Sequence, residues 1–172
     1  MEIEIKFKVD FNEIKGKIEN LGATLIREEV QEDLYFSVPL PKLLRIRHIL
    51  NLGEVILGYK EIQDEKNEEF DEIEVKVEDF EKMKEILIRL GFGEDVWVRK
   101  HRFVYKLDDV TFELNRVENL GDFLDIEVIG GDVEGAKGKI WKIARKLGLK
   151  KADVESRLYQ ELMREKREAT LQ

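Results

Sequence analysis

The first residues alternate strictly between charged and apolar side chains and read EIEIKF over positions 2–7. A period of two places successive side chains on opposite faces of a β-strand. The pattern therefore predicts a strand with an apolar face and a charged face, the latter formed by Glu2, Glu4 and Lys6.

A helix is expected directly after this strand. Asp10 is followed three residues later by Glu13, which is typical of a capping box at a helix N-terminus. Apolar side chains then recur at helical spacing up to Leu21, and Gly22 is a typical stop signal.

The same strand–helix pattern returns twice. Residues 72–77 read EIEVKV, and a second helical pattern runs from Asp79 to Gly91. A weaker third copy begins at 125–128 and ends at 147–148. Repeated units of this size, in so few copies, indicate a duplicated α+β domain rather than a solenoid.

Most of the remaining sequence reads as strands. They are expected at 24–36, 43–49, 53–62, 96–106 and 110–117, separated by turn residues. Asp153 is expected to cap a C-terminal helix, and the charged run 164–172 to fray. The expectation is one domain over 1–172, with about eight strands and four helices.

The content of charged residues is unusually high. Charged residues make up 40% of the sequence, against roughly 25% in typical soluble domains. This excess favours ion-pair networks and a heat-adapted source. The formal net charge of −8 disfavours general electrostatic binding of nucleic acid.

The composition also limits the chemistry. The protein has no cysteine and only two histidines, so a metal site would consist mainly of carboxylates. Carboxylate oxygens favour a hard ion, Mg²⁺ or Mn²⁺. No apolar run approaches the roughly 20 residues of a membrane span, and the N-terminus is unlike a signal peptide. A cytoplasmic protein without a membrane partner is therefore expected.

Two sets of charged residues carry the candidate chemistry. The acidic set is Glu2, Glu4, Glu72, Glu74, Asp125 and Glu127, and the basic set is Lys6, Arg45, Arg47, Lys60, Lys100 and Arg102. If the strands close into a barrel, both sets could line its interior. Clustered carboxylates favour a divalent cation, and clustered arginine and lysine favour phosphate groups. A metal-bound polyphosphate would satisfy both sets.

Two alternatives account for the same residues. The charged faces could simply point into water, or they could form a core of salt bridges. The second alternative is weaker because buried ion pairs roughly break even energetically. The repeated acidic strands and the Arg-x-Arg spacing favour the binding site.

The sequence resembles the CYTH family, the triphosphate tunnel metalloenzymes. Glu2 to Lys6 forms the E-x-E-x-K hallmark of that family, and residues 72–74 fall at the position of its central E-x-E. Further matches, several of them typical of class IV adenylyl cyclases, lie at 33–36, 44–47, 57–60, 100–105 and 120–127.

The resemblance implies an eight-stranded antiparallel tunnel that holds a triphosphate and one or two divalent metals. Its implied metal ligands are Glu2, Glu4 and Glu127, with Asp125 as a further ligand and Glu74 assisting. The implied catalytic residues are Lys6, Glu4 and Glu74. The implied phosphate-binding residues are Arg45, Arg47, Lys60, Lys100 and Arg102.

Three positions depart from the family pattern. Asn115 stands where the family often has Asp, which would remove one carboxylate ligand. Asp125 is one methylene shorter than the usual Glu, and the C-terminal motif at 156–163 is only approximate.

The resemblance leaves three functions open. The first is a class IV adenylyl cyclase, which converts ATP into cyclic AMP and pyrophosphate. The second is a triphosphatase that hydrolyses inorganic triphosphate, ATP or thiamine triphosphate. The third is a non-catalytic protein that binds nucleotides or polyphosphate. An RNA 5′-triphosphatase ranks lower because no basic stripe is visible. The sequence does not fix the oligomeric state, and a homodimer remains open.

Overall fold

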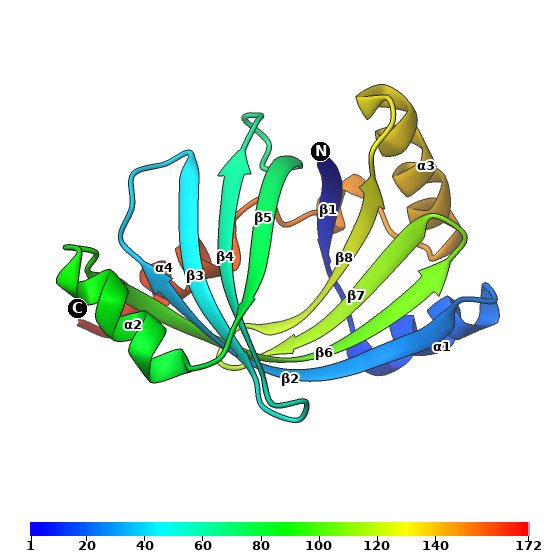
Figure 1. Cartoon of the computed structure of the whole chain (residues 1–172). Coiled ribbons are helices and arrows are strands. Elements are labelled where there is room, and N and C mark those ends of the chain that lie inside the picture. The colour runs from blue at the N-terminus through cyan, green and yellow to red at the C-terminus, as the bar shows by residue number, and fades with distance from the viewer. Residues whose placement is uncertain (172) are drawn as a thin grey trace.

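Eight antiparallel strands form a closed barrel in the computed structural model of the protein, which describes residues 1–171 (Figure 1). The order around the barrel is β1-β5-β4-β3-β2-β6-β7-β8. The strands are β1 (Glu2–Lys8), β2 (Thr24–Phe36), β3 (Lys42–Ile49), β4 (Glu54–Ile62), β5 (Glu69–Val77), β6 (Glu94–Leu107), β7 (Val110–Val117) and β8 (Gly121–Ile129). The expected α+β barrel is confirmed.

Four α-helices lie outside the barrel: α1 (Phe11–Asn20), α2 (Phe80–Arg89), α3 (Val133–Lys146) and α4 (Tyr159–Leu171). The first three each follow an acidic strand, as the repeated pattern predicts. Each is capped by an aspartate, namely Asp10, Asp79 or Asp132, whose carboxylate accepts a hydrogen bond from the backbone N–H three residues later. These caps satisfy N–H groups that a helix start otherwise leaves free.

Helices α1 and α3 cover the apolar outer face of β1, β7 and β8, whereas Ile73 and Val75 of β5 are 68% and 53% exposed. Ile5 and Phe7 of β1 are at most 1% exposed and belong to a core that includes Phe112 of β7 and Ile140 of α3. Because successive side chains of a strand point to opposite faces, burying the apolar face outside turns the charged face inward. The alternative in which both charged sets face bulk water is therefore wrong.

The barrel closes through a narrow seam. Strands β2 and β6 pair along most of their length, whereas β1 and β5 pair only at Glu2 with Phe70 and Ile3 with Glu69. One further backbone bond joins the Glu4 N–H to the Glu68 carbonyl at 2.8 Å. Figure 1 shows the gap between these two strands widening away from the seam.

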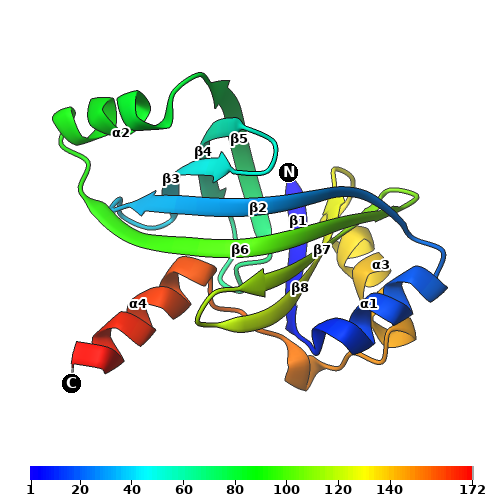
Figure 2. The same cartoon turned by 90° about the horizontal axis from the view of Figure 1, so that it is seen from below.

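The C-terminal region differs from its expectation. Asp153 does not cap α4, because it ends a short 3₁₀ helix (Lys151–Asp153) and accepts a hydrogen bond from the Lys150 N–H. The expected frayed run instead continues α4 to Leu171, and Gln172 lies outside the described residues. Ion pairs from Arg164 and Arg167 to Asp95 hold α4 against the start of β6 (Figure 2).

Membrane-spanning helices are absent from residues 1–171, where every helix is too short or too polar to cross a bilayer.

Candidate active site in the barrel interior

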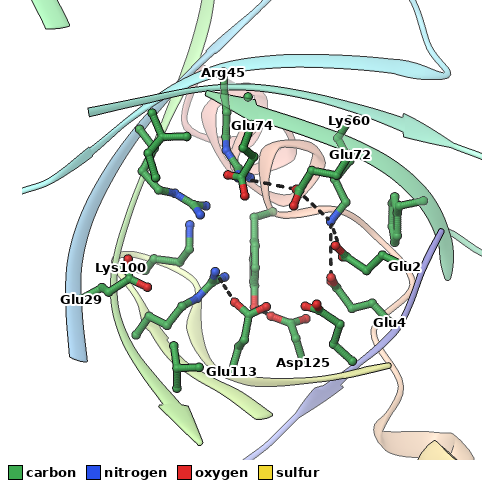
Figure 3. A pocket seen from close by; sticks show the side chains of 18 of the residues that line it. Glu2, Glu4, Glu29, Arg45, Lys60, Glu72, Glu74, Lys100, Glu113 and Asp125 are labelled. Carbon is green, nitrogen blue, oxygen red and sulfur yellow. Dashed lines mark hydrogen bonds and ion pairs between the residues drawn. The ribbon is translucent and has the colours of Figure 1, made fainter. Parts of the chain in front are cut away.

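The barrel encloses a cavity of about 470 Å³ that is lined mainly by charged side chains. Figure 3 shows these side chains converging on the cavity from the surrounding strands. Every candidate residue proposed from the sequence lines this cavity. They are Glu2, Glu4, Lys6, Arg45, Arg47, Lys60, Glu72, Glu74, Lys100, Arg102, Asp125 and Glu127. Alternation along the strands therefore brings both charged sets into one chamber.

Three carboxylates gather on neighbouring strands β1 and β8. Glu2, Glu4 and Glu127 each offer an oxygen, and these oxygens lie within 4.8 Å of one another. Such a set fits the oxygen coordination that Mg²⁺ and Mn²⁺ prefer. Asp125 does not belong to this group. The expected ligand set is thus brought together in three of its four members.

The ionisation of these carboxylates shows how crowded they are. Burial, with the neighbouring Glu4 adding to it, raises the pKa of Glu2 to about 9. Burial and Glu113 raise the pKa of Glu127 to about 11. Burial alone would also raise the pKa of Glu4, but Lys60 and other neighbours outweigh it and lower that pKa to about 2. The cluster thus places the ionised Glu4 beside two carboxyls whose ionisation the surroundings oppose, and a divalent cation would relieve this repulsion.

Lys60 pairs with two members of this cluster, and Arg45 pairs with two carboxylates of the neighbouring strand β5. Lys60 Nζ lies 3.1 Å from Glu2 and 3.4 Å from Glu4, while Arg45 Nη2 lies 3.0 Å from Glu74 and 3.8 Å from Glu72 (Figure 3). Burial lowers the pKa of Lys60, but the Glu4 and Glu2 carboxylates more than offset it, so the pKa rises and Lys60 stays charged. Lys60 is therefore available to phosphate oxygens if a metal draws Glu2 and Glu4 away from it.

A buried aspartate fixes two further cations. The Asp33 carboxylate accepts bonds from Arg47 Nε at 2.7 Å and Arg47 Nη2 at 2.8 Å, and from Lys100 Nζ at 2.7 Å. Asp33 is fully buried, and its strand register places it opposite Arg47. Burial outweighs the attraction of Asp33 and lowers the pKa of Lys100 to about 7.

Asn115 links an acidic and a basic site residue. Its Oδ1 accepts a bond from Arg102 Nε at 2.8 Å, while its Nδ2 donates to Asp125 Oδ2 at 2.8 Å. The Tyr159 hydroxyl donates to the same Asp125 oxygen at 2.8 Å. A carboxylate at position 115 could not donate, so the amide suits this position. These bonds occupy one oxygen of Asp125, and Oδ1 has no partner within residues 1–171.

Lys6 points toward the C-terminal region. Its Nζ donates to the Arg157 carbonyl at 2.7 Å and lies 4.4 Å from the centre of the Tyr159 ring. Burial lowers its pKa, although Asp125 and Glu4 act in the other direction. Lys6 therefore lies beside α4 rather than within the Glu2–Glu4–Glu127 cluster.

A comparison of the sequence with known protein families identifies the family of this barrel. The profile of the CYTH domain matches residues 1–159. The chain belongs to the CYTH domain family. The resemblance to the CYTH family that the motifs indicated is therefore confirmed. The barrel interior lined by both charged sets agrees with it.

Relatives of this CYTH protein are similar over nearly its full length. A protein from Methanocaldococcus jannaschii named "Putative adenylate cyclase" is 34% identical, over 94% of this chain and 98% of its own. A solved protein structure from Pyrococcus horikoshii is 57% identical with a TM-score of 0.93, over 94% of this chain and 99% of its own. A Hippeastrum protein named "Putative adenylyl cyclase" and described as having a dominant triphosphatase activity shares the fold at 19% identity and a TM-score of 0.63, over 87% and 89% of the two chains.

Sequence reasoning did not select three residues that organise the site: Asp33, Glu113 and Tyr159. Glu113 forms an ion pair with Arg102 and lies beside Glu127, and it shares the inward face of β7 with Asn115. Its position two residues before Asn115, which places both side chains on one face of the strand, could have identified Glu113 from the sequence. The contact of Tyr159 with Asp125 had no local signal, because it joins residues 34 positions apart.

Proposed function

We propose that this CYTH protein is a metal-dependent enzyme that acts on a triphosphate in the tunnel, and that it is an adenylyl cyclase. The observation that carries the proposal is the position of the Glu2–Glu4–Glu127 cluster opposite several buried cations in one cavity. Only a ligand that combines a divalent cation with a polyanion complements both walls. The names of the relatives support the choice of cyclase.

In this proposal each wall has a separate task. Glu2, Glu4 and Glu127 would hold Mg²⁺ or Mn²⁺, with Asp125 as a further ligand through its free oxygen. The bound ion would stabilise negative charge that develops on the phosphate oxygens. Arg45, Arg47, Lys60, Lys100 and Arg102 would bind the three phosphates and fix them in line for displacement.

The proposed cyclisation is an internal displacement. The ribose 3′-oxygen forms a bond to the α-phosphorus, the bond from that phosphorus to the bridging oxygen breaks, and pyrophosphate leaves. Glu74 has a lowered pKa, since Arg45 and Arg47 outweigh its burial, so it is ionised and could accept the hydroxyl proton. Lys6 would balance the charge on the leaving pyrophosphate.

A triphosphatase is the second candidate. The same phosphate-binding residues would serve it, because hydrolysis differs only in the nucleophile, a water, and in the phosphorus that is attacked. The dominant triphosphatase activity described for the Hippeastrum protein supports this second candidate.

The decisive experiment is product analysis by phosphorus NMR. ATP and inorganic triphosphate would each be incubated with the protein and Mg²⁺ or Mn²⁺, at moderate and high temperature. Cyclic AMP with pyrophosphate would establish the cyclase, and orthophosphate release would establish the triphosphatase. Intact substrates despite metal-dependent binding would refute both enzymes in favour of a binding protein.

Variants test the residue assignments. Glu2→Gln with Glu4→Gln should lower metal-dependent turnover at least about 100-fold, since single electrostatic contributions of this kind are worth 10²–10³. Circular dichroism should show an intact fold. The matched control is Glu65→Gln with Glu118→Gln, two exposed carboxylates outside the cavity. Retained turnover in the Glu2 and Glu4 variant would refute the metal assignment.

A further inference from the structure

Strand β5 contains the longest exposed run in the eight strands of the barrel. Its residues Asp71 to Lys76 are all exposed, on both faces of the sheet. The outward-facing Ile73 and Val75 are 68% and 53% exposed, whereas the outward-facing residues of β1 are buried under helices. Strands of a closed barrel normally have paired edges, so this exposure is unusual and needs a physical account.

One edge of β5 is unpaired over the same residues. The strand pairs with β4 from Phe70 to Val77, but with β1 only at Glu69 and Phe70. Beyond Phe70, no strand within residues 1–171 pairs with this edge. Figure 2 shows the end of β5 extending past the N-terminus of β1. A free edge of this kind is a template for a further strand.

The backbone groups at this edge belong to alternate residues. The Glu68 carbonyl accepts a hydrogen bond from the Glu4 N–H of β1, whereas the Glu69 carbonyl accepts one from the Gln63 N–H on the β4 side. Successive residues of a strand direct their backbone groups to opposite neighbours, so the even-numbered residues of β5 face away from β4. Along the unpaired part of the edge, these residues are Glu72, Glu74 and Lys76.

The sequence of this edge is complementary to itself. In an antiparallel pair of two β5 strands centred on Val75, Glu74 of each copy lies opposite Lys76 of the other. Opposite charges at directly facing positions stabilise a strand pair, and like charges destabilise it. A pair centred on Ile73 would oppose Glu72 to Glu74, and one centred on Glu74 would oppose that carboxylate to itself. Charge therefore selects the pairing centred on Val75.

The same pairing covers the exposed apolar residues. It places the two Val75 side chains opposite each other and Ile73 opposite Val77 on the outer face. On β4, Leu57 lies beside Val75 and Tyr59 lies beside Ile73. An apolar strip would thus run from one sheet into the other, and exposed apolar surface of this kind marks interaction sites. Self-complementary contacts are what a two-fold symmetric dimer requires.

We propose that this chain forms a two-fold symmetric dimer in which the β5 strands of two copies pair antiparallel about Val75. The backbone groups of Glu74 in each copy bond to those of Lys76 in the other, so one sheet continues across both barrels. Because Glu74 and Lys76 also line the cavity, the second copy borders its opening. The proposal is independent of the proposed function, since it uses the edge and outer face of β5 rather than a ligand.

The mass in solution tests the dimer. Sedimentation equilibrium of the parent protein at about 100 µM should give twice the 20.3 kDa of one chain, and the mass should fall on dilution. Lys76→Glu would oppose carboxylates at both ends of the contact, so its dimer Kd should rise at least about tenfold. The control is Lys106→Glu, an exposed position on β6, with an unchanged Kd. A monomeric parent protein would overturn the proposal and leave the edge to an extended segment of another protein.

A cysteine variant tests the register. The chain has no cysteine, so Val75→Cys introduces a single thiol. The two Val75 positions form a non-hydrogen-bonded pair, whose Cα atoms lie about 4.5 Å apart, within the range for a disulfide. Mild oxidation should therefore link most molecules into a dimer on a non-reducing gel. The control is Leu52→Cys, which is 44% exposed in a turn outside β5 and should remain unlinked.

A second cysteine position separates the pairing from its alternatives. Ile73→Cys would face Val77 of the other copy, so it should cross-link at least about tenfold more slowly than Val75→Cys, because its own symmetry mate lies beyond disulfide reach. Circular dichroism should show an intact fold in both variants. Equal rates at the two positions, or a dimer of the parent mass that links at neither, would refute the pairing about Val75.

Discussion

At the residue scale, Asp33 is a buried charge that holds the side chains of Arg47 and Lys100 in place. Asp33 is fully buried and bonded to two basic side chains. Burial alone would raise the pKa of its carboxyl, but the charges of Arg47 and Lys100 outweigh this effect and hold the pKa well below the usual range. Removing one partner of a buried charge pair leaves the others unpaired. Asp33 therefore supports the phosphate-binding wall although it is not part of that wall.

Replacing Asp33 by Asn should destabilise the protein by about 3–5 kcal/mol at pH 7, the range for breaking a buried ion pair. Because the folded-state pKa is lowered, this stabilisation is complete above the unfolded pKa of about 4 and is lost as pH falls further. Urea unfolding at pH 7 and in stronger acid would measure it. Glu32→Gln is the control, because its partner Arg99 is exposed and such pairs contribute about 1 kcal/mol or less. Equal losses in the two variants would contradict the argument.

Asn115 provides a second test at this scale. Asn115→Asp would place a carboxylate against Asp125, where the amide now donates a bond of 2.8 Å. Two adjacent carboxylates cannot both ionise freely, so the metal-free variant should lose roughly 1–3 kcal/mol at pH 8 and less at pH 5, where they can share a proton. Thermal melts at both pH values would show it. Asn12→Asp, in an exposed position, should change little. A metal-free variant as stable as the parent protein would rule out the proposed role of the amide.

At the scale of elements, local signals predicted most of the fold. Alternation gave β1 and β5, and aspartate caps gave α1 and α2, because the residues that define these elements are neighbours in the sequence. The start of α4 was missed for the opposite reason. Leu158 has no capping side chain, and the contact of Tyr159 with Asp125 at the helix start joins residues 34 positions apart. Asp153 looked like a cap but belongs to the preceding turn.

The anchoring of α4 can be tested through Asp95. Asp95 pairs with Arg164 and Arg167, and its side chain is only 9% exposed. Asp95→Ala should weaken the docking of α4 by about 1–2 kcal/mol, which corresponds to a 5- to 30-fold faster cleavage by trypsin between Arg164 and Arg167. Asp109→Ala removes an exposed pair with Lys139 and serves as the control. If the two variants are cleaved at the same rate, the contacts with β6 do not hold the helix.

At the scale of the whole molecule, the sequence indicated which charges would face inward but not which would meet. The contacts inside the tunnel depend on how strands that are distant in sequence align. Examples are the pairing of Asp33 with Arg47 and Lys100, and the separation of Asp125 from the Glu2–Glu4–Glu127 cluster. A shift of one residue in that register would move every one of these side chains to the other face. The tunnel was therefore predictable as a class of site, whereas its internal pairing was not.

The overall charge balance predicts that metal and triphosphate bind cooperatively. The protein has a net charge of −8, and the cavity is lined by nine acidic and eight basic side chains, so the apo tunnel has no large excess of positive charge to attract a polyanion. A divalent cation at Glu2, Glu4 and Glu127 would release Lys60 from its carboxylates and add two positive charges. Calorimetric titration should thus show inorganic triphosphate binding at least tenfold more tightly with Mg²⁺ than in EDTA, a coupling of at least about 1.4 kcal/mol. The coupling should disappear in the variant with Gln at positions 2 and 4, whereas equal affinities with and without metal in the parent protein would show that the basic wall binds the phosphates unaided.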